Sequence, residues 1–106
     1  MSSDLISCPP IGNHHIQRSD EHKALIIDHK MVKFTPTEYR LLIPLLSGQL
    51  VSDANLIREA FNGDASPLAR KSMEKHIDNI RGKLCACGLT IHRITKFSYV
   101  LLEAPD

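Results

Sequence analysis

Basic side chains gather in one stretch of the sequence, where their types and spacing suit contact with an anionic polymer. Residues 67–96 hold seven Lys and Arg residues against only Glu74 and Asp78, a net charge of +5. The segments on either side each carry −2, so the whole chain carries only +1, a bulk value that gives no support to nucleic-acid binding. Lys and Arg neutralise phosphates, and an amide such as that of Asn79 can pair with an adenine edge. The local pattern therefore indicates a candidate surface for double-stranded DNA.

The same charges also have a purely structural interpretation. Arg70, Lys71 and Lys75 lie three or four residues from Glu74 or Asp78. Opposite charges at these spacings support an isolated helix through ion pairs. The charge pattern alone leaves both interpretations open, a solvated helix face and a DNA contact.

Thiols and imidazoles are the other reactive groups. Cys85-x-Cys87, followed by His92, has neither the spacing of a zinc site nor the C-x-x-C of a redox pair. With Cys8 the cysteine count is odd, which favours reduced cytosolic thiols over a disulfide framework. We expect no metal site and no cofactor. Four histidines of the N-terminal third could at most bind adventitious metal: His14, His15, His22 and His29.

Catalysis has no supporting pattern in this sequence. The five glycines are isolated, so no phosphate-binding loop is present, and no Ser-His-Asp order with an elbow glycine occurs. No apolar run reaches the length of a membrane span, and the first ten residues carry no basic residue of a signal peptide. We therefore expect a cytoplasmic protein that is not an enzyme and does not contact membranes.

A chain of 106 residues suits one domain. Residues 1–13, rich in Pro and Ser, predict a flexible N-terminal arm, and residues 14–104 predict the folded domain. Apolar runs broken by polar turns between residues 14 and 34 predict a small antiparallel β-meander, with a tight turn at Asp28-His29-Lys30.

Three helices and a hairpin are expected after this meander. Thr35-Pro36-Thr37-Glu38 has the spacing of a capping box, and Pro44 should kink or shorten the helix that follows. Ser52 and Ser66 are candidate caps of two further helices, which gives a helix-turn-helix. The third helix is predicted over about residues 67–87, with an apolar stripe at Met73, Ile77, Ile80 and Leu84. Residues 90–95 and 98–102 predict a C-terminal β-hairpin.

Three segments, in this order, resemble the winged-helix effector domain of OmpR/PhoB-type response regulators of bacterial two-component systems. They are residues 35–42 (TPTEYRLL), residues 71–84 (KSMEKHIDNIRGKL) and residues 91–99 (IHRITKFSY). The resemblance covers about residues 14–102. It implies an α+β fold, a winged helix-turn-helix with an N-terminal β-meander, a three-helix bundle and a C-terminal hairpin wing.

The resemblance also implies a mode of DNA binding. The third helix would enter the major groove, the wing would touch the minor groove, and the loop Asn62–Pro67 could contact RNA polymerase. The implied DNA-binding residues are Lys71, Ser72, His76, Arg81 and Lys83 at the phosphate backbone, Lys75 and Asn79 at base edges, and Arg93 and Lys96 on the wing. Members of the family often pair on tandem half-sites, which allows a homodimer on DNA.

The sequence departs from the family at Asp78, at Gly82 and in the wing, where Thr95-Lys96-Phe97-Ser98-Tyr99 replaces Arg-Gly-x-Gly-Tyr. The leading prediction is a transcription regulator, or its effector domain, that binds double-stranded DNA. The departures keep an alternative open, a degenerate winged-helix module that binds the transcription machinery or another regulator. A receiver domain needs more than these 106 residues, so we expect an excised effector domain or a stand-alone regulator.

Overall fold

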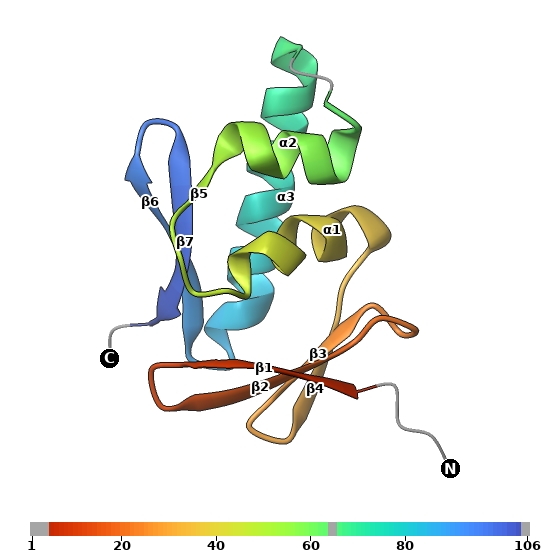
Figure 1. The fold of residues 1–106 in the computed structure, drawn as a ribbon, viewed down its shortest axis with the longest axis vertical. Helices are drawn as coiled ribbons and strands as arrows, with labels where there is room; N and C mark the ends of the chain where they lie inside the picture. Colours follow the sequence, from red (N-terminus) through yellow and green to blue (C-terminus); the bar gives the residue numbers. More distant parts are fainter. Residues whose placement is uncertain (1–4, 64–65, 105–106) are drawn as a thin grey trace.

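The structure, a computed structural model, describes residues 5–63 and 66–104. Within these residues, two antiparallel sheets and three helices form an α+β fold, with the four-stranded sheet at one end and the helices beyond it (Figure 1). The elements are β1 (Leu5–Ile11), β2 (His14–Ser19), β3 (Ala24–Ile27), β4 (Lys30–Lys33), α1 (Pro36–Leu45), β5 (Val51–Ser52), α2 (Asp53–Phe61), α3 (Pro67–Cys85), β6 (Leu89–Thr95) and β7 (Ser98–Glu103).

The N-terminal sheet has the order β1-β2-β3-β4, and Leu25 at its centre pairs with Arg18 on one side and Val32 on the other. Asp28 and His29 both have positive φ, which is the geometry of a two-residue hairpin turn. This confirms the predicted meander and its tight turn.

The prediction of a flexible arm over residues 1–13 is wrong for Leu5–Ile11, which form β1 and pair with β2 from Leu5↔Ser19 to Ile11↔His14. Residues 1–4 lie outside the described part of the chain. Two facts explain the strand. Ile11 is buried in the core, and Pro9 and Pro10 fall in a register irregularity, where their missing N–H groups cost no regular ladder bond.

Helix α1 begins as the sequence predicts. The Thr35 hydroxyl accepts from the Glu38 backbone N–H, and the Glu38 carboxylate accepts from the Thr35 N–H, so both halves of the capping box form. The helix ends at Leu45, one residue after Pro44, as expected where proline removes a hydrogen bond of the ladder.

Helix α3 also follows its sequence signals. Ser66 caps it, and the predicted stripe of Met73, Ile77, Ile80 and Leu84 is at most 1% exposed. The helix ends at Cys85 rather than Cys87, because residues 86–88 turn back towards β6. Gly88 has φ +83° in this turn, and a Cβ there would meet the His14 ring at 2.9 Å, so the position requires glycine.

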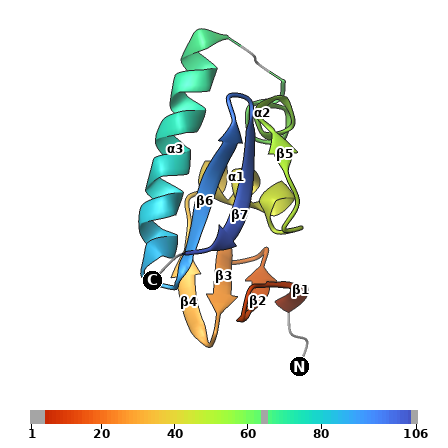
Figure 2. The same cartoon turned by 90° about the vertical axis from the view of Figure 1, so that its left-hand side faces the viewer.

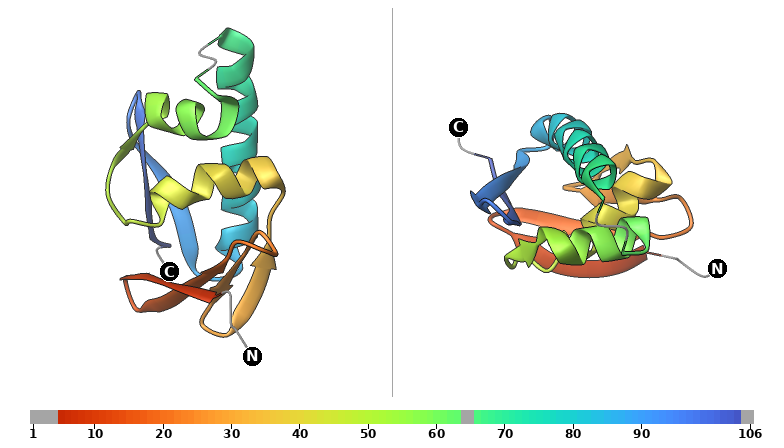
Figure 3. Two further views of the ribbon diagram at one scale, coloured as in Figure 1. Left: turned by 45° about the vertical axis from the view of Figure 1, so that its right-hand side comes forward. Right: turned by 90° about the horizontal axis from the view of Figure 1, so that it is seen from above.

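The predicted C-terminal hairpin is β6–β7, which the short strand β5 extends to a three-stranded sheet of order β5-β7-β6. Figure 2 shows this hairpin running alongside α3, and the left view of Figure 3 shows the helices above the N-terminal sheet and beside the hairpin. The two sheets meet where the Asn13 N–H donates to the Glu103 carboxylate at 3.0 Å. In the described ranges, no helix combines the length and apolar character needed to cross a membrane.

Candidate nucleic-acid interface

One face of α3 packs against the core, and the opposite face is exposed. Lys71, Lys75 and Asn79 are all exposed on this face. Residues four apart on an α-helix advance by about 40°, so the three side chains form one short stripe. Among residues 5–63 and 66–104, the ammonium groups of Lys71 and Lys75 have no ion-pair partner. We refer to Lys71, Lys75 and Asn79 as the α3 stripe.

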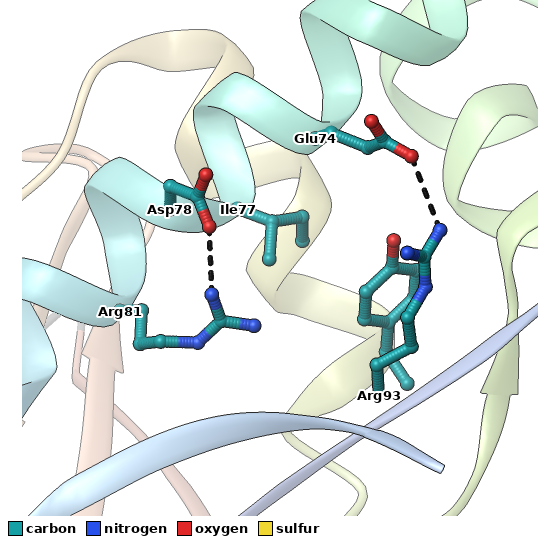
Figure 4. Close-up of a pocket in the computed structure, with 6 residues that line it drawn as sticks. Glu74, Ile77, Asp78, Arg81 and Arg93 are labelled. Carbon is teal, nitrogen blue, oxygen red and sulfur yellow. Dashed lines mark hydrogen bonds and ion pairs between the residues drawn. The ribbon is translucent and has the colours of Figure 1, made fainter. Parts of the chain in front are cut away.

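The acidic residues of α3 do not pair with these lysines. Glu74 accepts from the Arg93 guanidinium on β6 at 3.1 Å, and Arg93 lies 5.5 Å from the centre of the Tyr99 ring. Figure 4 shows the Glu74–Arg93 pair bridging the helix and the hairpin. Burial raises the pKa of the Tyr99 hydroxyl above its ordinary value. This set of contacts fixes the hairpin beside the exposed face of α3.

A second pair lies one turn along the helix. The Arg81 guanidinium donates to Asp78 at 2.6 Å through one nitrogen and to the Ile91 carbonyl of β6 at 3.0 Å through Nε. The two pairs border a hollow of about 160 Å³ between α3 and the hairpin (Figure 4). Part of the charge of Arg81 and of Arg93 is therefore already compensated.

Lys83 has another partner. Its ammonium donates to the Glu38 carboxylate at 2.6 Å and lies 5.4 Å from the Phe34 ring centre, which ties the end of α3 to the start of α1. Glu38 is 3% exposed. Burial alone would raise the Glu38 pKa, but the hydrogen bonds from Lys83 and from the Thr35 backbone outweigh it and lower the pKa. Lys83 also lies about 120° around the helix from Lys71.

Ser72 and His76 lie on the flank of α3 that faces α2 and are half-buried. The His76 ring packs 6.3 Å from the Phe61 ring, and its Nδ1 is buried without a hydrogen-bond partner among the described residues. A buried N–H without an acceptor is costly, so the proton of the neutral ring belongs on Nε2. The remaining candidate, Lys96, lies in the hairpin turn, with Nζ 5.9 Å from the Phe97 ring centre.

Asp53 is a residue that sequence reasoning missed. Its side chain is 8% exposed and forms an ion pair with Arg70 of α3, and its backbone N–H donates to the Phe97 carbonyl at 2.8 Å. Asp53 thus joins α2, α3 and the hairpin turn. An acidic residue directly after the Ser52 cap signals a favourable helix start, but nothing in the sequence identifies its distant partners.

The loop Asn62–Pro67 is described only at its ends. Asn62 ends α2 with a left-handed backbone, Pro67 begins α3, and residues 64 and 65 lie outside the described ranges. Cys85 is exposed and Cys87 half-buried, and both are free thiols. The described part of the chain holds no group of three or more His, Cys, Asp or Glu side chains that could hold a metal ion.

Comparison with known proteins identifies a similar fold. No protein-family model and no curated protein matches the sequence. Among solved structures, one similar chain is described as a novel family of redox sensors in the streptococci evolved from two-component response regulators. The two chains superpose with a TM-score of 0.69 at 20% identity, over 96% of this chain and 45% of the other.

This likeness shows that the two chains share a fold, which in the described part of this chain is a small α+β unit with antiparallel sheets and three helices. The chain spans less than half the length of that neighbour.

Proposed function

We propose that this chain is a transcription regulator, or the effector domain of one, that binds double-stranded DNA as a winged helix-turn-helix. Helix α3 is the recognition helix and the β6–β7 hairpin is the wing. The observation that carries the proposal is the α3 stripe, whose two ammonium groups and one amide are exposed and have no ion-pair or hydrogen-bond partner among the described residues, on a helix whose other face is buried. The origin of the streptococcal neighbour in two-component response regulators supports a regulatory role.

The stripe has the dimensions and chemistry that a major groove requires. A helix with its side chains is about 10–12 Å across, and the groove is about 12 Å wide. Lys71 and Lys75 then reach phosphates, Asn79 pairs with a base edge, and the His76 Nε2–H and Ser72 hydroxyl donate to backbone oxygens on the α2 side. Arg93 and Lys96 are the DNA contacts of the wing.

Changing Glu74 to Gln should tighten duplex binding by roughly three- to tenfold at about 50 mM salt. The variant removes a negative charge that faces the DNA and releases the Arg93 guanidinium from its ion pair. Glu21→Gln, an equal charge change at an exposed turn of the N-terminal sheet, is the matched control. Fluorescence anisotropy of both variants measures the difference, and equal affinities would exclude Arg93 and Glu74 from the interface.

Changing Asn79 to Ala should alter sequence preference more than overall affinity, because an amide reads bases and carries no charge for phosphates. Selection of bound duplexes from a random pool, with wild type and variant, measures the preference. We expect one position of the selected motif to lose its bias. An unchanged motif would mean that Asn79 does not face a base.

Titration of a labelled random duplex at about 50 and 200 mM salt tests the proposal itself. Binding at low salt that weakens by about fiftyfold at high salt supports it. Absence of binding at low salt would overturn it and favour the alternative, a module that binds a protein of the transcription machinery. The ion pairs of Arg81 and Arg93 are the observation that favours this alternative, because they compensate two of the predicted contact charges.

A further inference from the structure

The tip of the β6–β7 hairpin exposes two large apolar side chains. Ile94, next to the last residue of β6, is 52% exposed, and Phe97, in the turn Lys96-Phe97 between β6 and β7, is 55% exposed. Isolated exposed apolar residues are common on soluble proteins, but a pair at the tip of one turn is a small apolar projection.

The backbone of this tip is held at several points. The Phe97 N–H donates to the Thr95 hydroxyl at 3.3 Å, the Thr95 and Ser98 hydroxyls share a hydrogen bond, and the Phe97 carbonyl accepts from the Asp53 N–H. Since Asp53 also pairs with Arg70 of α3, the tip is fixed relative to the α3 stripe. Figure 2 shows the turn lying near the start of α2, with α3 alongside the hairpin.

The charge around the tip matches a polyanion. Residues 93–98 hold no acidic residue; Lys96 has no ion-pair partner among the described residues, whereas Arg93 is paired with Glu74 of α3. The Lys96 ammonium lies 5.9 Å from the Phe97 ring centre. A ring that enters an apolar space between stacked bases would carry this ammonium to the flanking phosphates. Proteins that bind the minor groove insert Phe, Ile or Leu between base pairs in this way and bend the duplex.

We propose that Phe97, supported by Ile94, is a wedge that inserts between base pairs in the minor groove and bends the bound duplex. This inference rests on the proposed DNA binding. It assigns the hairpin a preference for steps that unstack easily, such as TA, over stiff steps. The wing thus selects sequence through DNA deformability, while α3 reads base edges in the major groove.

The test uses a duplex of about 24 base pairs with a central TA step, a fluorophore at each end and 2-aminopurine at the step. We expect the wild-type protein to shorten the end-to-end distance and raise the 2-aminopurine emission. Phe97→Ala should bind roughly tenfold more weakly and produce neither signal, because the buried phenyl ring is lost. Phe97→Trp should retain both signals.

Met31→Ala is the matched control, because Met31 is 52% exposed on β4 of the N-terminal sheet. It should behave as wild type. The wedge is overturned if wild type binds the duplex without bending it, or if Phe97→Ala bends and binds it equally well, while the proposed DNA binding survives both results. If wild type does not bind at low salt, the proposed function fails as well. If Phe97→Ala changes only self-association in sedimentation, the tip is a contact between copies and the wedge is wrong.

Discussion

Replacing Lys71 and Lys75 together by alanine is expected to weaken duplex binding about a hundredfold at about 50 mM salt. Each phosphate contact contributes about 0.9 to the slope of log affinity against log salt, which is about tenfold in affinity at that salt concentration. The two ammonium groups have no ion-pair partner among the described residues, so nothing compensates their charge before DNA binds. The slope of log affinity against log salt should become shallower by about 2, and binding to all DNA sequences should weaken alike.

The matched control is Lys30→Ala with Lys33→Ala. These lysines are exposed on β4, at the edge of the N-terminal sheet, and their removal changes the net charge equally. Because they lie on a different element from the α3 stripe, we expect only a small loss of affinity. Equal losses in the two double variants would show that binding follows net charge and does not use α3.

Replacing Lys83 by Met is expected to destabilise the fold by about 2 kcal/mol, because it leaves the Glu38 carboxylate buried without its cation. The Glu38 side chain is 3% exposed, whereas the Lys83 side chain is 38% exposed. Water can therefore solvate an unpaired Lys83 ammonium but not an unpaired Glu38 carboxylate, so most of the cost of breaking the pair falls on Glu38. Lys33→Met, at an exposed position on β4, should have little effect. Urea unfolding of both variants measures the difference in the free energy of unfolding.

The pH dependence of this effect has a defined sign. In the wild type the Glu38 pKa is lowered, so its contribution to stability is present above the usual carboxyl pKa and is lost as pH falls through the lowered value. Without Lys83, protonation relieves the buried charge, so the gap between variant and wild type should narrow in acid. Glu38→Gln combined with Lys83→Met should recover part of the loss. A gap that is constant with pH would mean that the pair does not stabilise through charge.

The folded Lys83→Met variant should retain duplex affinity within about threefold, because its ammonium serves Glu38. The family resemblance implies a backbone contact for this lysine. A loss of duplex affinity as large as that of a Lys71→Ala variant would instead support the backbone contact that the resemblance implies.

The parts of the fold that the sequence predicts depend on neighbours a few residues apart. The capping box of Thr35 and Glu38 spans one helical turn, and the stripe from Met73 to Leu84 repeats every three or four residues. Local spacing determines both. The strand β1 was missed because Pro9 and Pro10 are typical of a tether, whereas the buried Ile11 and the pairing with β2 determine the structure.

The partners of charged residues were not predictable in this way. Lys83 and Glu38 are 45 residues apart in the sequence, and Arg93 and Glu74 are 19 apart. Helix spacing suggests Lys71 or Arg70 as partners of Glu74, yet the hairpin supplies Arg93 instead. Four of the seven basic residues between 67 and 96 are in ion pairs: Arg70, Arg81, Lys83 and Arg93.

These four ion pairs reduce the number of uncompensated charges in the basic segment. The basic segment that stands out in the sequence contains three cations with no ion-pair partner among residues 5–63 and 66–104: Lys71, Lys75 and Lys96. Each uncompensated cation that contacts a phosphate makes the slope of log affinity against log salt more negative by about 0.9. We therefore expect a slope of about −3 for the wild type. That modest value agrees with a net charge of only +1.

Backbone amide chemical shifts of the labelled protein, followed while duplex DNA is added, test the central claim most directly. We expect the shifts to concentrate on residues 71–79 of α3 and residues 93–98 of the hairpin, with little change in the N-terminal sheet. The Lys71→Ala, Lys75→Ala variant should need far more DNA for the same shifts. Shifts confined to the N-terminal sheet, or no shifts at low salt, would contradict the account.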